Sequence, residues 1–257
     1  MNRHPNFLNP TIQEAICEVA FTVEAGFDHK ILFEKFYLVV KDVYPHIFPL
    51  ENFNSSPSSN DMNLLLNLFQ AGMRFKRSDR DSSIVLTHIR NNEYRLAVSQ
   101  LPRYEGWYTL RSDLEYAWKS ANEILQVENL GQIAIRYINR IPRTSFEESV
   151  GDWLKSSRYI SQAILEASET LKSVFFMDEV NTGITQVAVS LISKELRETI
   201  EDNGAILLDL LRIVRLQGIV PFGSLIEKAD RLHDEIWQTF SQMHTEKLLK
   251  LLNGDLI

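Results

Sequence analysis

The chain has 257 residues, of which 44% are hydrophobic and 24% are charged, so it is long enough to bury a core as one large domain or two closely associated ones. With 10 glycines and 8 prolines, the composition excludes a disordered, collagen-like or low-complexity chain. The 27 basic residues against 34 acidic ones give a net charge of −7, which argues against attraction of the whole molecule to nucleic acid.

The first half of the chain predicts a strand, a helix, three strands and a second helix. Alternation of apolar and polar residues indicates the strands, whereas apolar residues at steps of three and four indicate the helices. In chain order these elements are a strand at Ile12–Val23, a helix from Asp28 to Pro45, strands at Met62–Phe75, Ile84–Arg90 and Glu93–Leu101, and a helix at Leu110–Leu125. Residues 45–61 are rich in proline, serine and asparagine, which predicts a surface loop. Asn91 and Asn92 tolerate the positive φ of a tight hairpin turn.

The second half repeats this order of elements. Its elements are a strand at Ile133–Ile141, helical spacing from Val150 to Leu171, strands at Val174–Val180, Ile184–Ile192 and Ile206–Leu216, and a closing helix from Leu225 to Met243. A charged connector at 193–203 precedes the last strand.

Two pairs of elements align at nearly one offset, which predicts an internal duplication. Trp118 corresponds to Trp237, and the strand around Ile16–Phe21 corresponds to the strand around Ile135–Arg140. We therefore expect an α+β fold of two similar β-α-β-β-β-α halves, 1–130 and 131–257, in one compact body. Each half contributes an antiparallel sheet with helices packed on one side, and a pseudo-twofold axis relates the halves. The other face of the sheet is expected to be open.

Four segments resemble a sporadically distributed prokaryotic family of conserved hypothetical proteins of about this length. The segments are Asn9–Phe21, Ile135–Ile141, Leu207–Asp209, and Leu232–Ile236 with the residues that follow it. The resemblance spans the whole chain and implies a one-piece architecture, but this family carries no assigned activity. Its patchy occurrence resembles that of genes in mobile or phage-defence neighbourhoods.

The sequence contains none of the common short catalytic motifs. It has no dinucleotide or P-loop glycine motif, no Gly-x-Ser-x-Gly and no His-Glu-x-x-His. Cys17 is the single cysteine, so a disulfide within the chain or a cysteine-rich metal site cannot form, and a reducing compartment is expected. With no apolar leader and no long apolar run, the sequence predicts a cytoplasmic protein that does not enter a membrane. No cofactor or metal is expected.

Arg136 and Arg140 lie on one face of the predicted strand at 133–141 and could grip a phosphate-bearing ligand or an acidic partner. His88 is a further candidate on the same open side of the sheet. A structural reading competes with this one: the offset of the duplication matches Glu18 to Arg136, which predicts a partly buried ion pair between the two central strands.

The stretch between Met73 and Arg111 is rich in basic and aromatic residues and is called the basic meander below. Arg74, Lys76, Arg77 and Arg80 are its candidate contacts with single-stranded nucleic acid, because cations beside stacking aromatics hold such strands. The competing reading is a solvated hairpin whose aromatic residues point inward.

These patterns predict a non-catalytic binding or regulatory protein that recognises a partner protein or a small anionic ligand through the open face of the sheet. The first alternative is a nucleic-acid-binding component that uses the basic meander. The second is a hydrolase that acts through His88 or His233 with nearby carboxylates, although His233 on an apolar helix stripe also fits a packing role. A homodimer is a possible assembly and a reasonable default, because an extended sheet edge favours pairing with a second copy.

Overall fold

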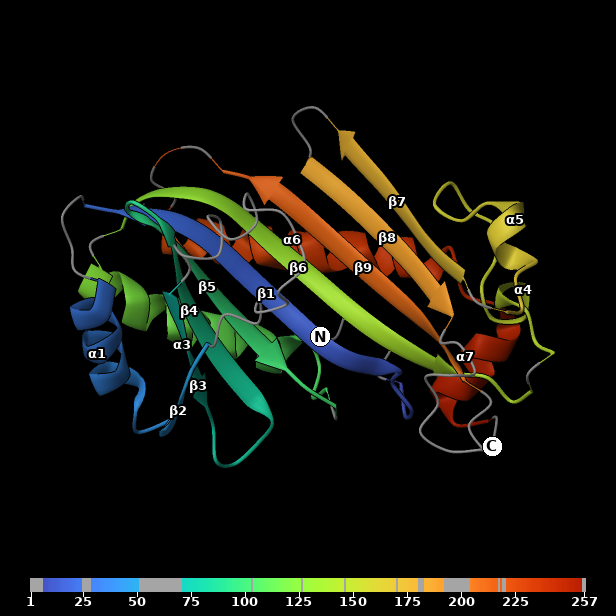
Figure 1. Ribbon diagram of the computed structural model, residues 1–257, viewed down its shortest axis with the longest axis horizontal. Coiled ribbons are helices and arrows are strands. Elements are labelled where there is room, and N and C mark those ends of the chain that lie inside the picture. Colours follow the sequence, from blue (N-terminus) through green and yellow to red (C-terminus); the bar gives the residue numbers. More distant parts are fainter. Residues whose placement is uncertain are drawn as a thin grey trace, which may run out of the picture.

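The strands form a single antiparallel sheet in the computed structural model, which describes residues 7–24, 29–50, 71–102, 104–125, 127–145, 147–169, 171–179, 183–191, 204–216, 218 and 221–255. The strand order across the sheet is β2-β3-β4-β5-β1-β6-β9-β8-β7 (Figure 1). The strands are β1 (Ile12–Val23), β2 (His46–Pro49), β3 (Ala71–Lys76), β4 (Ser82–Arg90), β5 (Glu93–Gln100), β6 (Val127–Pro142), β7 (Leu171–Glu179), β8 (Gly183–Leu191) and β9 (Ala205–Arg215). The described helices are α1 (His29–Val40), α3 (Trp107–Leu125), α4 (Val150–Trp153), α5 (Gln162–Leu165), α6 (Phe222–Ser241) and α7 (Glu246–Asn253).

The predicted α+β class with an antiparallel sheet is confirmed, and strand β1 shows why the sequence folds this way. Its buried and half-exposed residues alternate strictly from Ala15 to Val23, as expected of a strand with one covered face. The buried set includes Cys17, Val19 and Phe21. The predicted bounds of this strand are confirmed at both ends.

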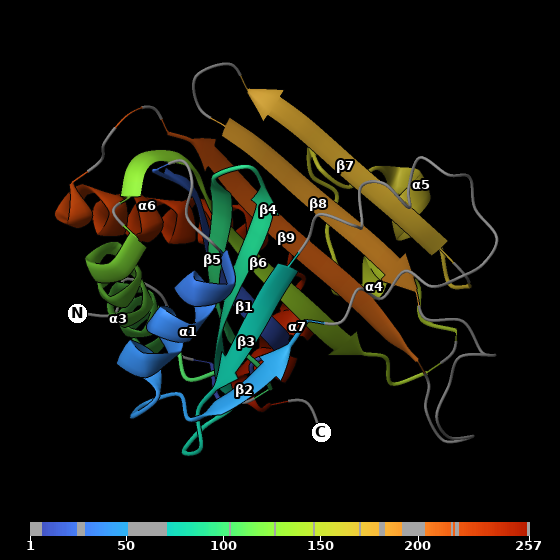
Figure 2. The same ribbon diagram turned by 60° about the vertical axis from the view of Figure 1, so that its left-hand side comes forward.

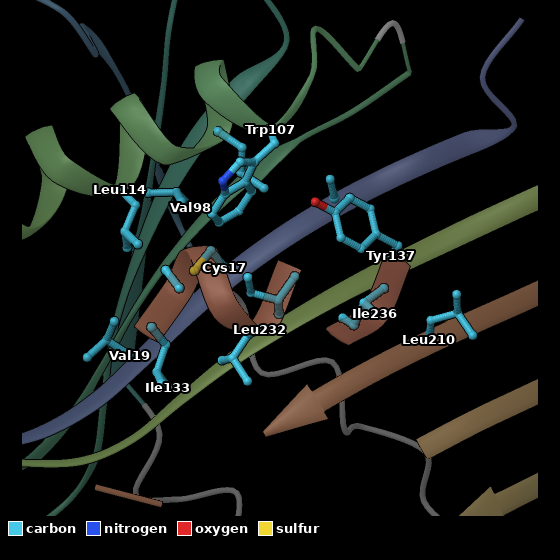
Figure 3. Packing of buried hydrophobic residues seen from close by; sticks show 14 of the residues in the cluster. Cys17, Val19, Val98, Trp107, Leu114, Ile133, Tyr137, Leu210, Leu232 and Ile236 are labelled. Atoms are coloured by element: carbon cyan, nitrogen blue, oxygen red, sulfur yellow. The ribbon is translucent and has the colours of Figure 1, made fainter. Parts of the chain in front are cut away.

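Helices α3 and α6 cover one face of the sheet, and the other face is not covered by any described helix (Figures 1 and 2). Each helix buries an apolar stripe: Leu110, Leu114 and Ala117 point inward from α3, and Leu232 and Ile236 do so from α6. Figure 3 shows Leu114, Leu232 and Ile236 beside residues of the strands, among them Val19, Val98 and Ile133. The core therefore lies between the sheet and its helices, and α1, α4 and α7 add buried residues such as Phe36, Trp153 and Leu248 to it.

Strands β1 and β6 lie side by side at the centre of the sheet, so the two halves of the chain share one sheet rather than forming separate ones. In the register between them, Cys17 lies opposite Ile135 and Ile16 lies opposite Arg136. The other strands of the first half lie beyond β1, and those of the second half lie beyond β6.

Several sequence predictions differ from the structure. The helical spacing between 150 and 171 yields two one-turn helices, because Ser149 and Ser161 each begin a new turn and the serine-rich stretch between them favours turns. Part of the predicted loop at 45–61 forms strand β2, and residues 51–61 lie outside the described residues, as do the predicted strand residues 62–70 and the connector at 193–203. Helix α7 was not predicted.

None of the described helices combines the length and the apolar character required to cross a lipid bilayer.

Candidate functional site

A cavity of about 960 Å³ lies between helices α3 and α6 on the covered side of the sheet, and we call it the α3–α6 pocket. A volume of this size falls in the range of ligand pockets, about 300–1,000 Å³. Its walls come from the segment before and at the start of β1, the loop and first turn of α3, the middle of β6 and β9, and one side of α6 and α7. It is lined by Phe7, Pro10, Thr11, Ile12, Tyr104, Glu105, Gly106, Trp107, Tyr108, Arg111, Tyr137, Asn139, Leu210, Glu227, Asp230, Arg231, His233, Asp234, Ile236, Trp237, Phe240 and Leu252.

A parallel pair of rings forms one wall of the pocket. The indole of Trp107 stacks on the imidazole of His233 with ring centroids 4.5 Å apart and an angle of 8° between the planes. The indole nitrogen donates a hydrogen bond of 2.8 Å to Asp230, and the guanidinium of Arg111 donates to the same carboxylate oxygen at 3.0 Å. These contacts tie the first turn of α3 to α6 and fix the orientation of both rings.

A chain of three polar groups crosses the floor of the pocket. The hydroxyl of Tyr137 lies 3.0 Å from Nδ1 of His233 and 3.1 Å from the hydroxyl of Tyr104. Burial raises the pKa of Tyr137 well above its usual range, and burial likewise raises that of Tyr104. Both phenols are therefore neutral near pH 7 and act as hydrogen-bonding groups rather than as phenolates.

The remaining walls are mostly apolar. Phe7, from the segment before β1, lies with its ring centroid 5.8 Å from that of Trp237, which in turn lies 5.9 Å from Phe240. Thr11 donates a hydrogen bond of 3.1 Å to the buried amide oxygen of Asn139. The pocket thus combines an aromatic wall with polar and charged groups, and a small-molecule site commonly pairs apolar walls with a set of polar groups that orient the ligand.

Acidic groups outnumber basic ones around the pocket. Its lining includes four carboxylates and two guanidinium groups, and both guanidinium groups are already in ion pairs. Arg111 binds Asp230, while Arg231 binds Glu235 on the next turn of α6. Glu227, at the exposed rim, has no cation within 4 Å among the described residues. The local field therefore favours a neutral or positively charged occupant over an anion.

Arg136 and Arg140 lie on the open face of the sheet, as predicted, and away from the pocket. Arg136 is bound to one carboxylate by two hydrogen bonds, from Nε at 2.9 Å and from Nη2 at 2.6 Å, and that carboxylate belongs to Asp209 of β9. The hydrogen bond to Asp209 raises the pKa of Arg136. A guanidinium held in this bidentate way has its preferred edge for an anionic ligand already occupied.

The predicted ion pair between Glu18 and Arg136 is wrong as a direct contact. Both Glu18 and Asp209 lie diagonally from Arg136 on the neighbouring strands, because Arg136 is opposite Ile16 on one side and Leu211 on the other. Asp209 is the residue that reaches it, whereas the ion pair of Glu18, at 3.7 Å, is with Arg95 of β5. The charges on the open face therefore pair across β5–β1 and β6–β9 instead of across the central β1–β6 pair.

The two candidate histidines belong to different elements, His88 to β4 and His233 to α6. His88 lies near the hairpin between β4 and β5, with Nε2 2.8 Å from the backbone oxygen of Asn91, and its ring contacts Tyr94 on the covered side. It is therefore not grouped with Arg136 and Arg140. His233 lies in the wall of the α3–α6 pocket. The described residues contain no cluster of three or more histidine, cysteine or acidic side chains that could hold a metal ion.

Most cations of the basic meander are neutralised by carboxylates. Arg77 binds Asp79 at 2.7 Å, and Arg80 binds Asp113, a buried carboxylate of α3. Among the described residues, Arg74 and Lys76 have no carboxylate within 4 Å. Of the aromatic residues in this stretch, Phe75, Tyr94 and Trp107 are buried and Tyr108 is exposed. This arrangement matches the inward-facing hairpin that competed with the nucleic-acid reading.

Sequence reasoning did not find the pocket because its residues come from separate segments. Tyr104, Trp107, Tyr137 and His233 lie on two helices, a loop and a strand, and no short motif joins them. Two signals were present. Trp107 stands at the start of an amphipathic helix, where an indole often finds a polar partner, and His233 falls within a segment singled out by the family resemblance.

Comparison with protein-family models and with curated protein sequences finds no match to this chain.

Proposed function

We propose that this protein is a non-catalytic binding or regulatory protein whose ligand is a flat aromatic molecule, neutral or positively charged, held in the α3–α6 pocket. The observation that carries this proposal is the stacked pair of Trp107 and His233 in the wall of a cavity of about 960 Å³. Aromatic walls favour flat ligands because ring stacking adds to the burial of apolar surface.

The charge of the pocket defines the ligand further. The sequence predicted a small anionic ligand at Arg136 and Arg140, but the acidic excess around the α3–α6 pocket opposes an anion there. Two interactions favour the binding of a positively charged ring in the α3–α6 pocket. The ring can stack on indole or phenol faces, and its charge is attracted to carboxylates such as Glu227. The ligand class therefore shifts from anionic to neutral or cationic.

The state of the polar groups favours binding over catalysis. The phenols of Tyr104 and Tyr137 are held in their neutral forms, and Nδ1 of His233 already contacts one of them. A general base would need a free nitrogen aimed at a substrate and an oriented nucleophile beside it. An imidazole with Nδ1 hydrogen-bonded can still act as a base through Nε2. The one aliphatic hydroxyl among the residues that line the pocket, that of Thr11, already donates to Asn139, so the hydrolase hypothesis lacks an oriented nucleophile and is the weaker proposal.

We also propose that the two halves of the chain descend from a duplication, as the sequence offset suggests. Outward from the central β1–β6 pair, the neighbours are β5 and β9, then β4 and β8, then β3 and β7. Cys17 lies opposite Ile135 (135 − 17 = 118), and Arg111 binds Asp230, which lies 119 positions later. Residues separated by the offset of a duplication meet only on its twofold axis, so the central strands and the helix pair support one common axis.

A thermal-shift experiment tests the proposed ligand class. The probes are flat heteroaromatic compounds in matched neutral, cationic and anionic forms, such as nicotinamide, the N-methylnicotinamide cation and nicotinate. We expect the neutral and cationic forms to raise the melting temperature of the protein, since a ligand stabilises the state that binds it.

Matched variants locate the effect. Tyr108→Ala removes an exposed aromatic side chain at the pocket, and Phe48→Ala removes an exposed aromatic side chain from β2, outside the pocket. The shift should fall in the first variant and persist in the second. A panel in which no compound shifts the melting temperature, or in which the anionic forms are the best ligands, would refute the proposal.

A further inference from the structure

The two edges of the sheet differ in their ability to accept another strand. At one edge, β2 has four residues and contains Pro49, whose missing N–H interrupts a ladder. At the other edge, β7 has nine residues without proline, and no described strand pairs with its outer side. Long, unprotected edge strands are templates for pairing with another chain. Figure 2 shows β7 as the outermost strand of the second half.

The open-face side chains of β7 form a short self-complementary pattern. In order they are Lys172, Val174, Phe176 and Asp178. Val174 is 55% exposed and Phe176 is 59% exposed, and both are among the large hydrophobic residues that the fold leaves uncovered. A strand that reads cation, apolar, apolar, anion can pair with an antiparallel copy of itself so that every open-face position meets a favourable partner. Asp178 also pairs with Arg215 of β9 in its own chain at 3.1 Å, but its side chain stays 43% exposed and accessible to a second cation.

We propose that β7 is a homodimer interface, in which a second copy of the chain adds its own β7 in antiparallel register about a twofold axis at Phe175. In this register Lys172 lies opposite the partner's Asp178, and Val174 lies opposite the partner's Phe176. Opposite charges and apolar groups placed directly across an antiparallel pair stabilise it, and like charges destabilise it.

Neighbouring registers lack this match. A shift that centres the axis on Phe176 places Val174 opposite the partner's Asp178, and a shift that centres it on Val174 places Lys172 opposite the partner's Phe176. Centring between residues would turn one copy over, so that the open face of one copy continued into the covered face of the other. The axis at Phe175 is the register that keeps the helices of both copies on the same side and pairs the charges.

Charge reversal with rescue tests this interface by sedimentation velocity. We expect the wild-type chain to form dimers as its concentration rises. Lys172→Glu places two carboxylates opposite each other at both ends of the interface and should weaken dimerisation about tenfold or more, and Asp178→Lys should do the same with two cations. The double variant restores both interchain pairs but loses the ion pair of Asp178 with Arg215, so it should dimerise about threefold or more tightly than either single variant without reaching the wild-type affinity. Lys35→Glu, on an exposed position of α1, is the matched control and should leave dimerisation unchanged.

Cross-linking tests the register independently of affinity. A mixture of the Val174→Cys and Phe176→Cys variants should form a mixed disulfide dimer faster than either variant alone, because opposed positions bring the two Cβ atoms within disulfide reach. Cys17 is buried and does not compete. A wild-type chain that stays monomeric, single reversals that dimerise as the wild type does, or a double variant without rescue would overturn the proposal. A dimer without preferential mixed cross-linking would overturn the register.

Discussion

Removal of one hydroxyl from the floor of the α3–α6 pocket tests the hydrogen-bonded chain described there. Tyr137→Phe keeps the ring in place and deletes the group that joins Tyr104 to His233 at 3.1 Å and 3.0 Å. Tyr137 is only 5% exposed, so its hydroxyl depends on these two partners. Each net hydrogen bond contributes about 1 kcal/mol, and Tyr104 is partly buried and can reach solvent. We therefore expect a loss of about 1–2 kcal/mol in the free energy of unfolding.

Urea denaturation followed by circular dichroism measures this loss, and a double-mutant cycle isolates the contact. Tyr104→Phe alone should cost about 1 kcal/mol. Once the hydroxyl of Tyr137 is absent, removing that of Tyr104 should cost less, because its hydrogen-bond partner has already gone. A double variant whose loss equals the sum of the single losses to within about 0.3 kcal/mol would refute the proposed chain.

Three further predictions concern other buried groups. Asp113→Asn should lower the free energy of unfolding by about 2 kcal/mol, since it removes the buried charge that pairs with Arg80; an unchanged urea midpoint would contradict this. Burial opposes ionisation of Glu148, but hydrogen bonds, above all from Lys247, outweigh it and lower the pKa of that carboxyl from 4.5 to about 2. A depressed carboxyl pKa contributes stability above pH 4.5 that is lost as the pH falls towards 2. Glu148→Gln should therefore make the free energy of unfolding less dependent on pH between 4.5 and 2. A curve for the variant that runs parallel to the wild-type curve would count against this prediction. Burial, with a smaller contribution from a neighbouring carboxylate, raises the pKa of Cys17, so iodoacetamide should label the native protein only as fast as it unfolds; rapid labelling under native conditions would disprove this.

Local sequence patterns predicted the central elements of the fold well. Strand β1 has the predicted bounds because strict alternation leaves one register with its apolar residues inward. Asn91 has the positive φ, 49°, that its place between two strands indicated. The stretch between 150 and 171 was harder, because helical spacing there is interrupted by serines whose side chains compete with the helical backbone.

Contacts between distant segments could not be predicted from the sequence alone. Glu18 and Asp209 are both diagonal neighbours of Arg136, and only the folded sheet shows that Asp209 is the one that reaches it. The pocket depends on the meeting of α3 and α6 on one face of the sheet, which brings Trp107 against His233. The sequence of α3 does not indicate that it will contact α6, and the reverse is also true, so only the tertiary structure shows the candidate site.

Native mass spectrometry of the protein, purified without denaturation and then mixed with the best compound of the matched heteroaromatic series, tests ligand binding in the α3–α6 pocket most directly. The account predicts one bound molecule per chain, with the adduct strongly reduced in Tyr108→Ala and retained in Phe48→Ala. Equal adduct in both variants would place the binding elsewhere and contradict the central claim.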